Sequence, residues 1–206
     1  MLALWLVAGP GQGLVLDRIA VTVDDRVITL SDVLEEIRLA ALLDGVPVQI
    51  TPESKRQAAR RLVEHVLLSR DMELTRYPLP SDEEVNQFIE QIRRARGLDA
   101  KTWEAEAHRY EIEPDRLREH LRRRLGILRY IAFRFRPEVQ PGPADSSQAA
   151  PAADSRVAGV SERAIAAARE AAQSALAARQ VDELVDAWLR EAKQRARIRW
   201  REEAFQ

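Results

Sequence analysis

Segments that favour β-strands occur only near the two ends of this sequence, and the residues between them favour helices. In the segment 196–200, Ala196, Ile198 and Trp200 alternate with arginines, the period of two that is typical of a half-buried strand. We expect Ile198 and Trp200 to face the core, because a slip of one residue would bury the arginines instead. An isolated strand is not stable, and the other strand-like residues lie at 17–30. The two ends of the chain are therefore predicted to pair.

The N-terminal strand region has the pattern of a hairpin. Two short runs rich in β-branched residues lie on either side of Asp24 and Asp25, which break the run and indicate a turn. Ser31 follows directly, and a serine at this place is predicted to cap a helix that ends near Gly45.

Helix start signals recur through the middle of the chain. Thr51 precedes Pro52, a cap residue followed by proline at the first helical position. Ser81 and Glu84 have the spacing of a capping box. The last helix begins at Ser161 and either continues or kinks near Gln180. Asp99 is predicted to cap a short helix. The predicted helices are 32–44, 52–76, 82–97, 100–110, 114–136 and 161–193. The predicted fold class is mainly α, a helical module with a small β-hairpin completed by a C-terminal strand.

Composition changes abruptly at residues 137–159. This segment is rich in Pro, Ala, Ser and Gly, and its large aliphatic residues are Val139 and Val157. Such a segment cannot bury enough apolar surface to order itself, so we predict a flexible linker. Because the strands at the two ends belong together, the linker is expected to be a loop inserted into one module formed by residues 14–136 and 160–206.

The first residues are strongly apolar. Residues 1–8 are followed by a Gly/Pro-rich stretch, and this run is far shorter than the roughly 20 apolar residues that span a bilayer. It has the apolar region of a secretory signal and the helix-breaking Gly and Pro residues that follow such a region, but it lacks the basic segment. We interpret residues 1–13 as a residual signal peptide, which implies a mature protein outside the cytoplasm. A frayed apolar N-terminus is the alternative.

Few residues suit catalysis or metal binding. The chain has no cysteine, which excludes thiol catalysis and Cys-ligated metals. His65 falls on an apolar helical stripe and is predicted to be a core residue. His108 and His120 lack metal-ligand spacing with the nearby glutamates 104, 106 and 119. No catalytic triad or phosphate-binding loop is recognisable, so we expect a protein that is not an enzyme and that uses no metal or cofactor.

Charge argues against a nucleic-acid partner. The 32 Lys and Arg residues against 33 Asp and Glu residues leave a formal net charge of −1, so no global field attracts nucleic acid or membrane. The segment 114–136 nevertheless has an arginine-rich face, and residues 190–201 are also basic. We interpret these arginines as a solvated face that neutralises acidic helices, such as residues 82–84 and 104–106. The face includes Arg118, Arg122, Arg123 and Arg129, extended by Arg134 and Arg136.

The order of these elements resembles one known family. Residues 17–33, DRIAVTVDDRVITLSDV, are similar to the opening of SurA-type periplasmic chaperones and their PpiD- and PrsA-like relatives. There a hairpin leads through a Ser-Asp or Ser-Glu pair into the first helix, and a C-terminal strand returns to complete the N-terminal module. The resemblance continues through residues 81–97, 98–110, 114–136, 188–191 and 196–200.

One departure from the family matters for function. Its members usually carry parvulin-type prolyl isomerase domains between the two halves of the chaperone module, where this chain has only residues 137–159. A catalytic domain cannot fit in about 23 residues, because domains need at least about 50.

The resemblance therefore implies an ATP-independent periplasmic holdase without its own isomerase activity. Its partners would be unfolded secreted polypeptides or outer-membrane β-barrel precursors, with no nucleic acid and no stable membrane insertion. The alternatives are a remnant or partner-dependent peptidyl-prolyl isomerase and, in a different class, a cytoplasmic nucleic-acid-binding helical protein.

Three aromatic residues stand just before the linker. Tyr130, Phe133 and Phe135 are expected by default to pack in the core. Any of them that is exposed is a candidate for holding an extended client peptide, because a chaperone needs shallow apolar surface that tolerates many sequences.

Overall fold

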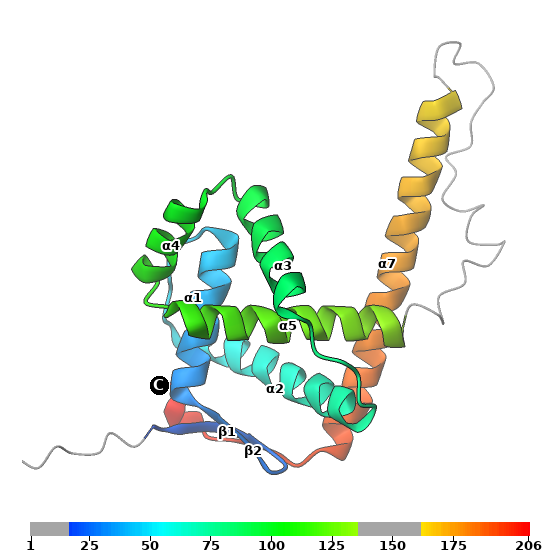
Figure 1. Ribbon diagram of the computed structural model, residues 1–206. Helices are drawn as coiled ribbons and strands as arrows, with labels where there is room; N and C mark the ends of the chain where they lie inside the picture. Colours follow the sequence, from blue (N-terminus) through cyan, green and yellow to red (C-terminus); the bar gives the residue numbers. More distant parts are fainter. Residues whose placement is uncertain (1–16, 136–161) are drawn as a thin grey trace, which may run out of the picture.

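The computed structural model describes residues 17–135 and 162–206, with the side chains of the last helix described from Ser174 (Figure 1). The predicted residual signal peptide at residues 1–13 and the predicted linker at residues 137–159 lie outside these residues. The described part is mainly helical with a small antiparallel sheet, which confirms the predicted fold class.

The sheet joins the two ends of the chain. It contains β1 (Ile19–Val23), β2 (Arg26–Thr29) and β3 (Ile198–Trp200) in the order β2-β1-β3, and both pairings are antiparallel. Figure 1 shows the blue hairpin and the red C-terminal segment side by side. The hairpin turns through Asp24, whose φ of 52° lies in the left-handed region that aspartate tolerates. The pairing predicted from the unpartnered C-terminal strand is confirmed.

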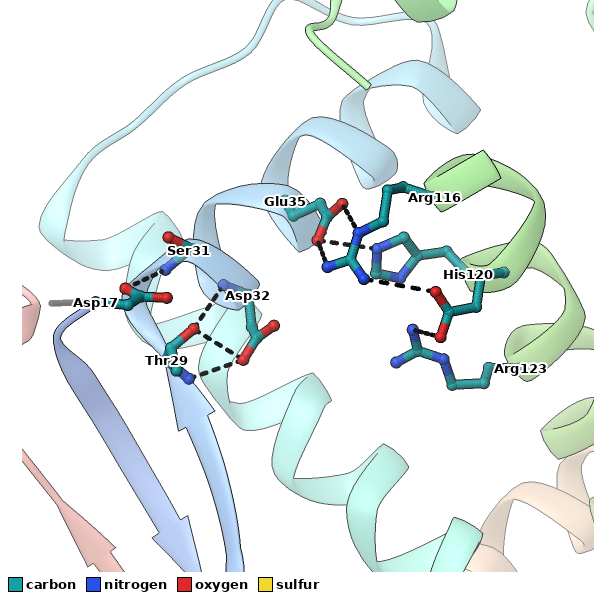
Figure 2. Close-up of polar contacts among 9 residues, drawn as sticks. Asp17, Thr29, Ser31, Asp32, Glu35, Arg116, His120 and Arg123 are labelled. Atoms are coloured by element: carbon teal, nitrogen blue, oxygen red, sulfur yellow. Dashed lines mark hydrogen bonds and ion pairs between the residues drawn. The ribbon is translucent and has the colours of Figure 1, made fainter. Parts of the chain in front are cut away.

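The first helix begins earlier than predicted. Helix α1 (Leu30–Asp44) is capped by Thr29, not by Ser31. The Asp32 amide donates to Thr29 Oγ1 at 3.2 Å, and the Thr29 amide donates to the Asp32 carboxylate at 2.9 Å, which completes a capping box (Figure 2). Ser31 lies in the first turn, where its amide donates to Asp17 Oδ1 at 3.3 Å.

Three of the later helices begin at their predicted caps. Thr51, Ser81 and Asp99 each accept a hydrogen bond from the amide three residues later. The last helix is continuous through Gln180. The helices are α2 (Pro52–Leu74), α3 (Asp82–Ala95), α4 (Ala100–Arg109), α5 (Pro114–Arg134) and α7 (Glu162–Arg195), followed by the short 3-10 helix η2 (Glu202–Ala204). None of the helices in the described part of the chain is both long and apolar enough to cross a membrane.

Helix α2 contributes to two of the three clusters of the core. The first cluster lies between the sheet, α1 and α2, and it includes Val21, Val63 and Phe205. The second joins α1 to α4 and the start of α5 around Leu42 and Trp103. The third joins α2, α5 and α7. The C-terminal segment therefore packs with the N-terminal elements as one module.

The exposure of Trp200 in β3 differs from the sequence prediction that its side chain faces the core. Trp200 pairs with Val21, and Ile198 pairs with Val23 and packs against the first cluster. Trp200 nevertheless remains 38% exposed, whereas the neighbouring Phe205 is fully buried, and the two ring centroids lie 5.9 Å apart. Arg199 is exposed, as predicted.

Candidate functional site

The aromatic residues at the end of α5 meet α2 and α7, and Tyr130 is the most deeply buried of them. Its side chain is fully buried, and its hydroxyl donates to Asp71 Oδ2 at 2.6 Å. Burial, and then the hydrogen bond with the Asp71 carboxylate, raise the pKa of Tyr130 above its ordinary value. The phenol is therefore protonated at neutral pH and fastens α5 to α2.

Phe135 connects α5 to α7. Only 3% of it is exposed, and its ring makes an edge contact with Trp188 at a centroid distance of 6.2 Å. The guanidinium of Arg134 lies 5.6 Å from the centre of the same ring. Tyr130 and Phe135 are thus core residues, and the hypothesis that they hold a client is not supported in this conformation.

Phe133 is the exposed member of the predicted trio. It is 61% exposed, and its ring lies 5.1 Å from that of Tyr77. Tyr77 in turn makes an edge contact with Tyr130 at 5.3 Å. The half-buried Tyr77, which packs on the buried Tyr130, therefore supports the phenyl ring of Phe133 at the surface.

The segment that carries Tyr77 exposes two more apolar side chains. Leu74, at the end of α2, is 74% exposed, and Leu79 is 68% exposed. The helix predicted at 52–76 ends just before the Tyr-Pro-Leu-Pro stretch at residues 77–80, and no functional role was predicted for this stretch. The signal that could have pointed to it is a large aliphatic residue between two prolines, where no helical face can bury it.

The histidines are dispersed. His120 Nε2 lies 3.1 Å from Glu35 Oε2, and Arg116 donates to both oxygens of the same carboxylate (Figure 2). Partial burial alone would raise the pKa of Glu35, but the contacts with Arg116 and His120 lower it below its ordinary value. His108 is exposed on α4. Among the described residues no three His, Asp or Glu side chains form a group that could hold a metal ion.

His65 is mostly buried on α2. Burial is the main cause that lowers its pKa below the ordinary value, and the charge of Arg124 acts in the same direction. The imidazole is therefore neutral at pH 7.

The arginine-rich face of α5 meets the acidic start of α3. Arg118 and Arg122 both pair with Asp82, and Arg129 lies 2.7 Å from Glu84. The hydrogen bonds from Arg118 and Arg122 lower the pKa of Asp82. The predicted neutralisation of residues 82–84 is confirmed.

The other acidic segment has different partners. Glu106 pairs with Arg96 at 3.0 Å and with Arg109 at 3.1 Å, neither of which belongs to α5. The prediction that the basic faces neutralise residues 104–106 is therefore wrong.

Comparison with known proteins adds no relative: no family model matches the chain, and no curated protein matches its sequence.

Proposed function

We propose that this protein is an ATP-independent periplasmic chaperone of the SurA type. It would act as a holdase for unfolded secreted or outer-membrane proteins, without prolyl isomerase activity of its own. The proposal rests on the resemblance carried by residues 17–33 and on the closure of the N-terminal hairpin by β3. Its location depends on the interpretation of residues 1–13 as a residual signal peptide.

The observation that carries the proposal is the exposure of Phe133. Leu74 and Leu79 are also exposed, on the segment that carries its ring partner Tyr77. Exposed apolar side chains on a rigid support can contact many unfolded sequences without a shaped pocket. Binding would lower the free concentration of aggregation-prone strand segments without any chemical step.

The test is suppression of aggregation. An unfolded β-barrel protein is diluted from denaturant, and its light scattering is followed with the wild type, Phe133→Ser and Ile50→Ser. Ile50 is a matched control, because it is an exposed apolar residue (48%) outside the aromatic cluster. We expect suppression by the wild type and by Ile50→Ser, and weaker suppression by Phe133→Ser at an unchanged melting temperature.

Two results would contradict the proposal. A wild type that does not suppress scattering excludes the holdase function, and equal suppression by both variants excludes the surface at Phe133. Turnover of a proline-containing tetrapeptide above the uncatalysed rate, in a preparation cleared of contaminating isomerases, would instead favour the isomerase alternative.

A further inference from the structure

A cleft of about 330 Å³ lies along α2. Val27 and Asp32 line it from β2 and the start of α1, and Arg123 and Arg124 line it from α5. Figure 2 shows Asp32 at the start of α1 and Arg123 on α5. The volume is at the lower end of the range of ligand pockets, about 300–1,000 Å³.

Arg124 is the unusual residue in this cleft. It is half-buried, and among the described residues no hydrogen-bond or ion-pair partner contacts its guanidinium. Every other half-buried arginine in the described part of the chain pairs with a carboxylate at an N–O distance of 3.2 Å or less. Partial burial of a charge is unfavourable unless the charge is paired. The cleft therefore favours a ligand that brings a negative charge to Arg124.

The other charged groups of the cleft already have partners. Arg26 pairs with Glu73 at 2.9 Å, and Arg123 pairs with Glu119 at 3.1 Å. Arg70 pairs with Asp24, and the buried Glu36 accepts from Arg61 at 2.8 Å. The nearby His65 is neutral because burial lowers its pKa. The Asp32 carboxylate accepts hydrogen bonds from the amide and the hydroxyl of Thr29. Arg124 is thus the cation of the cleft that no described residue pairs with.

The edge of β2 indicates what kind of ligand brings the negative charge. Arg26 of β2 pairs with Val23 of β1, and Ile28 pairs with Val21. The backbone groups of Val21 and Val23 therefore point toward β2, whereas those of Thr22, which lies between them, point toward β3. In an antiparallel ladder this alternation directs the amide and carbonyl of Val27 away from β1. Val27 is 52% exposed and lines the cleft. An extended peptide can hydrogen-bond to such an edge while a side chain enters the adjacent pocket.

We propose that this cleft binds an extended peptide segment that carries a carboxylate, with Arg124 as the ion-pair partner and the backbone of Val27 as the strand partner. This inference rests on the proposed function, since an unfolded client supplies such segments. It adds a polar, charge-selective site to the apolar surface at Phe133.

Peptide binding to the full chain tests the proposal. Fluorescence anisotropy is measured with labelled strand-forming peptides, blocked at both ends, that differ only in a central Glu or Gln. A third peptide carries the central Gln and a free C-terminal carboxylate, which separates a side-chain carboxylate from a terminal one. A hydrogen bond to a charged group contributes about 1.5–3 kcal/mol, so we expect a carboxylate to tighten binding by about tenfold or more.

Variants locate the effect. Arg124→Gln should abolish the preference for the carboxylate, whereas Arg60→Gln should retain it. Arg60 is exposed on α2 outside the cleft, so the second variant makes the same change in net charge. Val27→Pro removes the outward amide, which an edge strand tolerates, and should weaken binding of all three peptides.

Several outcomes would overturn the inference. Equal affinity of the wild type for the three peptides, or a preference that survives in Arg124→Gln, shows that Arg124 binds no carboxylate. Displacement of the peptide by inorganic phosphate at matched concentration shows a simple anion site. If the wild type suppresses aggregation in any of these cases, only the inference fails and the holdase proposal stands.

Discussion

Truncation of one C-terminal side chain, Phe205→Ala, is expected to destabilise the whole module. Phe205 is fully buried after η2, in the cluster that also contains Val21 and Val23 of β1. The other members of that cluster come mostly from residues 20–67, so this ring joins the end of the chain to its beginning. Its removal leaves a cavity in the core beneath the sheet.

The magnitude follows from complete burial. Truncation of a buried phenylalanine costs about 3–5 kcal/mol, a large part of the roughly 5–15 kcal/mol that stabilises a typical domain. In a chain of this size each kcal/mol lowers the melting temperature by about 2–4 °C, which gives a decrease of roughly 6–20 °C. Trp200→Ala should cost less, because Trp200 is 38% exposed. Arg199→Ala should remain within about 0.5 kcal/mol of the wild type, because Arg199 is exposed.

Urea and thermal unfolding followed by far-UV circular dichroism measure all three variants. A Phe205→Ala protein no less stable than Arg199→Ala would refute the packing of the C-terminus into this core. Deletion of residues 196–206 provides a second measurement, because it exposes the edge of β1 and should promote association on a sizing column. A monomeric truncation of unchanged stability would show that β3 contributes nothing.

Three further predictions concern other parts of the module. Cleavage at a protease site engineered into residues 137–159 should leave the two fragments together on a sizing column, because α7 packs on α2 and α5; separation without denaturant would contradict the single module. Tyr130→Phe removes the hydrogen bond to Asp71 and should cost about 1.5–3 kcal/mol in urea unfolding. Tyr77→Phe, at a half-buried ring, is its control and should have little effect. Because the pKa of His65 is lowered in the folded state, the unfolded state binds more protons below pH 6.5, and stability should fall as the pH decreases from there. His65→Gln should reduce the difference between urea midpoints at pH 7 and pH 5, and an unchanged difference would exclude this titration.

Helix starts were predictable because a cap is a local interaction. Thr51, Ser81 and Asp99 each bond an amide three residues ahead, so the residues that decide the boundary lie together in the sequence. The prediction failed at α1, where Thr29 and Ser31 are both suitable caps. Asp32 decided between them, because its carboxylate stands three residues after Thr29 and completes the reciprocal pair.

Exposure of the aromatic residues was not predictable in the same way. Phe133 and Phe135 are separated by only two positions, yet the first is 61% exposed and the second 3%. The difference depends on Trp188, which is distant in sequence and covers Phe135. Phe205 has no periodic neighbours, so its burial follows only from the return of the chain to the hairpin.

The three consecutive arginines 122–124 show what a net charge conceals. Successive residues of a helix point about 100° apart, so these side chains meet three different surroundings. Arg122 pairs with Asp82 of α3, and Arg123 pairs with Glu119 of its own helix. Arg124 lines the cleft, where none of the described residues pairs with it. A formal charge of −1 therefore argues correctly against a global field, but it does not reveal one partly buried cation that no described residue neutralises.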